Sequence, residues 1–469
     1  MSKKRNKELF GITVDTYAAE GKSIARVDNK VIFIEGVVPG DVVDVYLKKN
    51  KKDWAEAGVK NIVSLSPNRI AADCQHFGVC GGCKWQMLPY ELQLQYKQQQ
   101  VKDVLSRIGR VKDTEYLPIL GSEKKYQYRN KLEFTFSNKK YLSHEELNTT
   151  ASPLSDVLGF HAPRLFDKVI DIDKCHLMAE PQNEIRNGIR AYALAKQYTF
   201  YDIKNNNGLL RNMMVRTTAT GETLVNIVFG EKNMEVVNDV IQFLENTFPQ
   251  ITSLHYTINT KMNDTIYDLD VITVKGPGYI TEKLEGFTFK ISPKSFFQTN
   301  TLQAENLYRI TREFAQFTGK EVLYDLYCGT GSIGIFCSNE VSKIVGVESV
   351  PEAIEDAKEN ARMNQLENAH FYAGDVIKIC NDEFFATHGK PDVVITDPPR
   401  AGMHQALVDK LLEIAAPRIV YVSCNPATQA RDVALLSEKY KVIKVQAVDM
   451  FPHTHHVESV ALLELKEEC

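Results

Sequence analysis

The sequence lacks any long apolar segment. No stretch approaches 18 consecutive apolar residues, which excludes a transmembrane helix. The basic start of the chain is not followed by the apolar region that a secretory signal requires. We therefore expect a cytoplasmic protein with no membrane partner, in which the nine cysteines serve as metal ligands or catalytic groups rather than in disulfides.

An excess of positive charge is also missing. The net charge is −4, which by itself does not favour a nucleic-acid binder, although a whole-chain sum can hide local patches. One such patch is the run Lys48-Lys49-Asn50-Lys51-Lys52. It can be a solvated loop or a contact with RNA, and the sequence leaves both readings open.

What is present is the composition of a globular protein of several domains. The chain has 469 residues, of which 43% are hydrophobic and 25% charged. Residues 1–66 contain five short apolar runs separated by glycine and proline, which predicts a small closed, OB-like β-barrel. The expected strands are Gly11–Tyr17, Ser23–Val27, Val31–Ile34, Asp41–Leu47 and Ala55–Ser64.

The rest of the chain divides into two further expected domains. Residues 67–290 mix helix and strand patterns, including an amphipathic helix over Pro89–Gly109. Residues 291–469 alternate strands with helices, which predicts an α/β domain with a Rossmann-like, doubly wound and mostly parallel sheet. The strand-like runs of the middle domain are Leu132–Phe136, Met213–Thr217 and Thr223–Phe229.

A glycine-rich loop follows the first strand of the third domain, Val322–Leu326. Gly329, Gly331 and Gly334 provide the tight turn that lets a nucleotide approach the backbone. Asp325 precedes these glycines, and its carboxylate would repel a pyrophosphate but suits the ammonium of a methionine moiety. This favours S-adenosylmethionine over NAD without excluding NAD.

Two acidic residues follow the next strands of the same sheet. Glu348 ends the strand Ile344–Val347, where a carboxylate can accept both ribose hydroxyls. Asp375 follows the strand His370–Ala373 and could meet the adenine edge. The run Ser349-Val-Pro-Glu352 predicts a capping box for the helix between them.

Two other strand ends carry less common chemistry. The strand Val393–Thr396 runs into Asp397-Pro-Pro-Arg400, whose prolines hold the loop rigid. The strand Ile419–Ser423 runs into Cys424-Asn-Pro426. A cysteine beside a cofactor loop is placed to act as a thiolate nucleophile, although buried cysteines more often only pack.

Such a thiolate has a use in methylating uracil at C5. That carbon is a poor nucleophile until a thiolate adds to C6 and gives C5 carbanion character. A base must then remove the C5 proton so that the thiol can be eliminated.

These motifs resemble those of the TrmA/RumA-type RNA 5-methyluridine methyltransferases, in order and over nearly the whole chain. The matching runs are Ser295-Phe-Phe-Gln-Thr-Asn300, the loop DLYCGTGSIG, DPPR, SCNP and the final HVES. The barrel resembles a TRAM domain, an RNA-binding module. The resemblance implies Cys424 as nucleophile and Glu458 as base. It also implies a cofactor site formed by Gln298, Tyr327, Glu348 and Asp397, with Asp375 a weaker candidate. We expect Phe296 and Phe297 to be core residues.

A group of cysteines forms a second candidate site. Cys74, Cys80 and Cys83 lie within ten residues of one another, and Cys175 could supply a fourth thiol. The spacing fits a structural zinc or an iron–sulfur cluster. The resemblance extends to the [4Fe-4S] site of ribosomal members of the family and favours the cluster. For His453, His455 and His456 we expect active-site packing or RNA contact rather than metal binding.

The expected function is therefore the transfer of a methyl group from S-adenosyl-L-methionine to C5 of a uridine in 23S ribosomal RNA, by a monomer. The alternatives are the same chemistry on the T-loop of tRNA and a non-catalytic RNA-binding protein. The intact set of Asp397, Cys424 and Glu458 argues against the second alternative.

Overall fold

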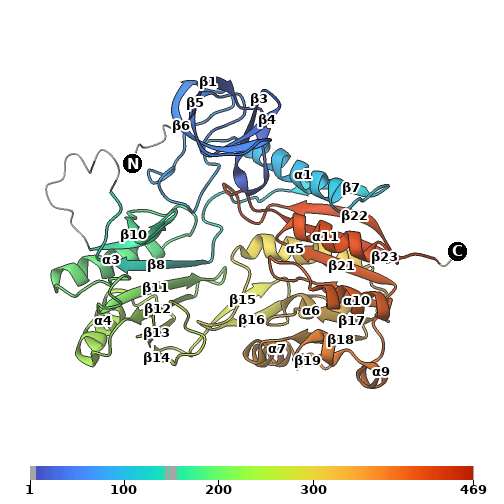
Figure 1. The fold of residues 1–469 in the computed structure, drawn as a ribbon. Helices are drawn as coiled ribbons and strands as arrows, with labels where there is room; N and C mark the ends of the chain where they lie inside the picture. The colour runs from blue at the N-terminus through green and yellow to red at the C-terminus, as the bar shows by residue number, and fades with distance from the viewer. Residues whose placement is uncertain (1–6, 143–145, 147–155, 468–469) are drawn as a thin grey trace.

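The computed structural model describes residues 7–142, 146 and 156–467, and it contains four β-sheets in that part of the chain. Figure 1 shows three bodies: the barrel at the top, the central region on one side, and the C-terminal region on the other. Among the described residues, no helix is long and apolar enough to cross a membrane.

The N-terminal barrel is a six-stranded sheet of order β1-β5-β6-β4-β3-β2. The expected first strand is in fact two, because Val14 and Asp15 turn their backbone N–H groups to Asp41 and Ile24. Alternate residues of the strands point inward around an apolar core. The strands are β1 (Glu8–Thr13), β2 (Thr16–Tyr17), β3 (Ser23–Val27), β4 (Lys30–Ile34), β5 (Val42–Asn50) and β6 (Trp54–Ser64).

The central region is built on a seven-stranded sheet of order β10-β9-β8-β11-β12-β13-β14. Two helices, α3 (Gln182–Ala195) and α4 (Met234–Thr247), bury their apolar faces against it in one core. The three predicted strands of this region lie within β8, β11 and β12. The strands are β8 (Lys131–Ser137), β9 (Val157–Ala162), β10 (Leu165–Asp171), β11 (Leu210–Thr217), β12 (Thr223–Phe229), β13 (Ser253–Ile258) and β14 (Val271–Lys275).

The C-terminal region contains the predicted doubly wound sheet, of order β19-β18-β17-β20-β21-β23-β22-β7. The first five strands are parallel, and β23 runs antiparallel to β21. Apolar cores cover both faces, one with α5 (Thr301–Ala315) and α7 (Pro351–Met363), the other with α10 (Gln405–Ile414) and α11 (Pro426–Leu436). The strands are β17 (Val322–Leu326), β18 (Lys343–Glu348), β19 (Ala369–Ala373), β20 (Val393–Thr396), β21 (Arg418–Ser423), β22 (Tyr440–Val448) and β23 (Glu458–Leu465). A separate hairpin of β15 (Ile280–Leu284) and β16 (Phe287–Ile291) precedes α5.

One segment of the expected central domain belongs to the C-terminal sheet. The predicted helix is α1 (Tyr90–Arg107), and its Val101 and Leu105 enter the same core as α10 and α11. The strand after it, β7 (Glu115–Leu120), pairs in parallel with β22 at the sheet edge. Figure 1 shows both elements in cyan beside the red C-terminal strands. The chain thus enters this sheet, leaves for the central region and returns.

Candidate active site

The carboxyl ends of three adjacent parallel strands bring the expected site residues to one edge. β17 pairs with β20, and β20 pairs with β21, all in parallel. Tyr327, Asp397 and Cys424 each follow one of these strands directly. Residues at this position in an open α/β sheet line its ligand-binding crevice.

Glu458 reaches the same edge from the opposite direction. β23 is antiparallel to β21, and Ser459 is paired with Ser423 in the register. Cys424 and Glu458 therefore lie next to a shared rung of the sheet, although they are far apart in sequence. Cys424 is half-buried, and Glu458 is only 5% exposed.

The pKa values of the acids at this edge are raised, mainly by burial. Burial raises the pKa of Glu458 to about 8; the nearby Asp397 carboxyl adds to the rise and the Arg400 guanidinium opposes it. Burial raises the pKa of Asp397 to about 7. The pKa of Cys424 is raised to about 11, first by burial and then by Glu458 and Asp397, while Arg400 lowers it. Displaced pKa values of this kind are typical of catalytic groups.

Arg400 is the cation that faces this group of acids. Its own carbonyl accepts hydrogen bonds from the Asn425 side chain at 3.0 Å and the Thr428 hydroxyl at 3.3 Å. These bonds tie the rigid proline loop to the loop that carries Cys424. The positive charge of Arg400 acts to lower the pKa values of both Cys424 and Glu458.

The glycine loop has room and unsatisfied polarity for a ligand. Gly329 has φ +53° and open space where a Cβ would stand. Asp325 is 1% exposed, and its Oδ2 accepts the Gly334 N–H at 2.9 Å. Its Oδ1 is buried without a hydrogen-bond partner in the described part of the chain. An orphaned carboxylate oxygen beside an open glycine loop suits a cationic group, as the sequence predicts for the methionine ammonium.

The other expected cofactor residues surround this loop in different ways. Glu348 accepts the N–H of Gly329 at 3.3 Å, so its carboxylate helps to shape the loop. Tyr327 holds a left-handed backbone with φ +60°. Gln298 lies half-buried between β16 and α5. Asp375 is exposed and caps α8 (Val376–Ile379) by accepting the Ile377 N–H at 3.0 Å.

Two local predictions are wrong. Ser349 does not cap α7; its hydroxyl donates to Glu348 at 2.9 Å, and Val350 stands at the N-cap without a side-chain bond. Phe297 is a core residue, but Phe296 is 67% exposed. The two rings alternate because the chain between β16 and α5 is extended rather than helical.

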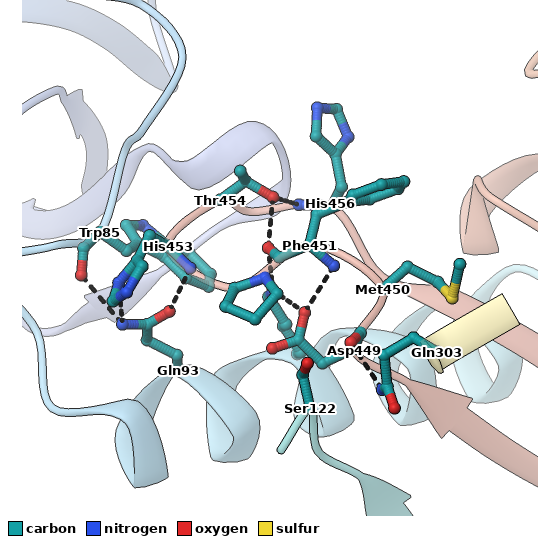
Figure 2. Close-up of polar contacts among 12 residues, drawn as sticks. Trp85, Gln93, Ser122, Gln303, Asp449, Met450, Phe451, His453, Thr454 and His456 are labelled. Carbon is teal, nitrogen blue, oxygen red and sulfur yellow. Dashed lines mark hydrogen bonds and ion pairs between the residues drawn. The ribbon is translucent and has the colours of Figure 1, made fainter. Parts of the chain in front are cut away.

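The loop that leads from β22 to Glu458 is anchored to α1. Lys97 donates to Asp449 at 2.6 Å, and both side chains are fully buried. Asp449 also accepts the Tyr90 hydroxyl at 2.9 Å and the Phe451 N–H at 3.1 Å. Figure 2 shows Gln93 of α1 continuing this network, accepting the His453 N–H at 2.9 Å.

The three histidines of this loop make ring contacts. His453 is 6% exposed and stacks on Tyr126 with ring centroids 4.5 Å apart. His455 and His456 lie ring to ring at 4.1 Å. Burial lowers the pKa of all three to about 4, so they are neutral at physiological pH. The packing part of the prediction is confirmed.

The four cysteines of the second candidate site line one cavity of about 490 Å³. Gln86 accepts the Cys74 N–H at 3.1 Å, and Asn183 accepts the Cys175 N–H at 2.8 Å, so side chains fix both backbones. Burial raises the pKa values of Cys80 and Cys83. Within the described residues, however, no three His, Cys, Asp or Glu side chains are arranged so that they could hold a metal ion.

The comparisons with known proteins match these observations. A doubly wound fold with a glycine loop and acids at the strand ends fits the class of S-adenosylmethionine-dependent methyltransferases, and the matches place the chain in it. The model of the tRNA (uracil-5-)-methyltransferase family matches residues 212–466, and that of the TRAM domain matches residues 6–60. The chain belongs to this methyltransferase family and carries an N-terminal TRAM domain.

Relatives match along their whole length. An uncharacterized RNA methyltransferase of Bacteroides thetaiotaomicron is 54% identical and covers 96% of this chain and 100% of its own. One of Chlorobaculum tepidum is 37% identical over 99% of this chain and 98% of its own. The crystal structure of a Pyrococcus abyssi tRNA (uracil-54, C5)-methyltransferase with S-adenosyl-L-homocysteine has a TM-score of 0.75 and 28% identity. It covers 96% of this chain and 100% of that one.

Proposed function

We propose that the protein methylates C5 of a uridine in 23S ribosomal RNA through a covalent bond between Cys424 and C6. The observation that carries this proposal is the register that puts Cys424 and Glu458 beside one rung of the sheet, next to Asp397. Bound S-adenosylmethionine supplies the methyl group. Asp325, Glu348, Tyr327, Gln298 and Asp397 would hold it, with Asp375 at the rim.

The residues of the site divide the chemistry between them. The Cys424 thiolate forms the bond to C6, and the C5–C6 π electrons become available at C5 to take the methyl group. The Glu458 carboxylate then accepts the C5 proton, and the electrons of that C–H bond restore the double bond as the C6–S bond breaks. Arg400, which opposes the raised pKa values of both groups, favours their charged forms.

Covalent trapping tests this assignment. RNA containing 5-fluorouridine should form a denaturation-resistant adduct with the wild-type protein, because fluorine cannot leave as a proton. Cys424→Ala should bind RNA but form no adduct and no product. Glu458→Gln should accumulate methylated adduct. Cys380→Ala, which removes another buried thiol, is the matched control. Turnover by Cys424→Ala would refute the covalent mechanism.

The choice of RNA is a separate part of the proposal. The TRAM domain and the cysteine group support ribosomal RNA as the substrate. The similar Pyrococcus tRNA enzyme, however, aligns with 96% of this chain. That alignment favours the tRNA T-loop as a second candidate. Mass mapping of modified nucleosides in ribosomal RNA and tRNA from cells lacking the protein would decide between them.

For the cysteine cavity we propose a [4Fe-4S] cluster held by Cys74, Cys80, Cys83 and Cys175. Four sulfur donors around one cavity suit zinc or iron–sulfur chemistry, and the resemblance to the ribosomal members of the family favours the cluster. Anaerobically purified protein should contain about four irons, and Cys83→Ser should lose them. Stoichiometric zinc without iron would refute the cluster.

We also propose that the protein is a cytoplasmic monomer of three domains, with the expected bounds 1–66, 67–290 and 291–469 changed only for the segment of α1 and β7. The position of α1 and β7 supports assigning that segment to the catalytic domain instead of the central one.

A further inference from the structure

The outer face of the TRAM barrel has a hollow of about 590 Å³ that lies outside the catalytic edge. It is formed where β4 and β6 run parallel, with Val31 beside Trp54 and Phe33 beside Glu56. The turn at Ala19–Gly21 closes one end. Because side chains alternate along a strand, Phe33, Trp54 and Glu56 point outward together.

Two aromatic rings, packed edge to face, are among the residues that line this hollow. Phe33 and Trp54 are both half-buried, with ring centroids 6.3 Å apart at an interplanar angle of 71°. The Lys49 ammonium lies 5.0 Å from the Trp54 ring. Flat aromatic surfaces beside a cation are the means by which proteins hold an unpaired nucleobase and its phosphate.

The lysine run of the sequence lies at the rim of the same hollow. The Lys51 N–H donates to the Trp54 carbonyl at 2.9 Å, which fixes the turn between β5 and β6 directly beside the aromatic wall. Lys51 and Lys52 are exposed there. Their charges are placed for the phosphates on either side of a base in the hollow.

Three carboxylates line the hollow and can accept hydrogen bonds, those of Glu20, Asp53 and Glu56. The Lys22 ammonium lies 3.4 Å from Glu20 and 3.7 Å from Glu56, so it separates the two acids and partly neutralises them. A carboxylate can accept two parallel hydrogen bonds from a guanine, whose N1–H and N2 amine lie side by side. Uracil and adenine present no such pair of donors on that edge.

The position of the hollow connects it to the catalytic loop. Gly21 has φ +69°, and a Cβ on it would lie 2.9 Å from the Cβ of His455. The turn that closes the hollow therefore packs on the loop that leads to Glu458. A strand of RNA whose target base reached Glu458 would pass this turn.

We propose that this hollow binds a single-stranded guanine of the substrate RNA, stacked on the Trp54 ring and read by Glu56 or Glu20. The inference rests on the proposed function for the identity of the partner as RNA. It adds a recognition site for a base other than the methylated one.

Tryptophan fluorescence of the full-length protein tests the proposal directly. The chain has two tryptophans, and Trp85 is only 1% exposed, so a ligand in the hollow quenches Trp54. Titration with the pentaribonucleotide UUGUU should quench this emission and show binding about tenfold tighter than UUAUU or UUUUU, the scale of one bidentate base contact.

Variants separate stacking from recognition, with binding read by anisotropy of labelled UUGUU. Trp54→Ala should weaken binding about tenfold through lost stacking. Glu56→Gln, combined with Glu20→Gln, should keep stacking but remove the preference for guanine. Phe10→Ala removes an exposed aromatic ring elsewhere on the barrel and should change nothing. Circular dichroism checks that each variant folds.

The outcomes do not depend on the catalytic assignment, because no cofactor or turnover is involved. Active methyltransferase with no quenching of Trp54 would refute the hollow alone. Equal quenching by all pentanucleotides would refute guanine recognition, and quenching by an oligoarginine peptide but not by RNA would identify the hollow as a protein-binding site instead. Failure of Cys424 trapping with intact guanine preference would refute the mechanism alone.

Discussion

Two buried acids lie at the two ends of one loop, and they differ in the hydrogen-bond donors around their carboxylates. Asp449, at its start, is fully buried and accepts hydrogen bonds from Lys97, Tyr90 and the Phe451 backbone. Glu458, at its end, is 5% exposed. In the part of the chain that the structure describes, no donor is hydrogen-bonded to its carboxylate, and its pKa is raised to about 8.

The difference indicates a structural role for Asp449 and a proton-exchanging role for Glu458. A buried carboxylate with three donors fixes its surroundings, whereas one without donors is costly to ionise and ready to exchange a proton. The buried Lys97 ammonium pairs with Asp449, which orders the loop, whereas Glu458 lies near the Asp397 carboxyl. Substitutions at Lys97, Glu458, Glu348 and Asp375 test this contrast, in order of decreasing expected effect.

Removing the Lys97 charge should destabilise the folded protein around Asp449. Lys97→Met leaves Asp449 buried without its charge partner, and we expect the free energy of unfolding to fall by roughly 3–5 kcal/mol. Chemical denaturation measures this. Lys60→Met is the control, because its ion pair with Glu8 is exposed and worth about 1 kcal/mol or less. Equal losses in the two variants would contradict the contrast.

Replacing Glu458 by a neutral residue should change the free energy of unfolding in the opposite direction. The pKa of Glu458 is about 8 in the folded protein against 4.5 unfolded, so the folded state keeps a proton that the unfolded state has lost. Stability from this group therefore falls as pH rises from about 4.5 to 8. Glu458→Gln should raise the free energy of unfolding by roughly 2 kcal/mol or more at pH 9 and leave it unchanged at pH 4.5. A gain that does not vary with pH would contradict this origin.

Glu348 is an acid whose carboxylate accepts hydrogen bonds from the backbone of the glycine loop and of the start of α7. Its carboxylate bonds to the backbone N–H groups of Gly329 and Val350. Glu348→Ala should weaken the binding of S-adenosylhomocysteine by roughly 1.5–3 kcal/mol, the scale of a hydrogen bond to a charged group. Calorimetry measures this, with RNA affinity unchanged. Glu352→Ala, an exposed acid in the first turn of α7, is the control, and undiminished binding in Glu348→Ala would remove that residue from the site.

Asp375 should give the smallest effect. It is exposed and caps α8, so Asp375→Ala should lower the free energy of unfolding by about 1 kcal/mol. Asp375→Asn keeps the cap and should restore it. If cofactor affinity falls in both variants by more than the stability, the residue contacts the cofactor as well as capping the helix.

Features that depend on residues close together in the chain could be predicted from the sequence. The DPP and SCNP motifs each follow their own strand, so strand and helix alternation was enough to place Asp397 and Cys424 at one edge. The family and the cofactor class are confirmed by the comparisons, and the roles of the individual residues stay predictions.

What failed depends on contacts that a local pattern does not contain. Ser349 fits a capping box, but the Glu348 carboxylate competes for its hydroxyl. β7 has an ordinary strand pattern, and nothing in it indicates pairing with β22. Lys97 and Asp449, 352 positions apart, form a pair that no sequence spacing suggests.

The entry of α1 and β7 into the C-terminal sheet also sets the order in which the protein can be built. A ribosome makes this helix and strand early and β22 near the end of the chain, so the sheet edge must wait for almost the whole chain to emerge. Pairing across such a separation is slow to form. Until then the apolar face of α1, with Val101 and Leu105, has no permanent cover. Synthesis of the final strands is thus the event that completes the catalytic body, and a fragment starting at residue 291 would expose β22 as a bare edge.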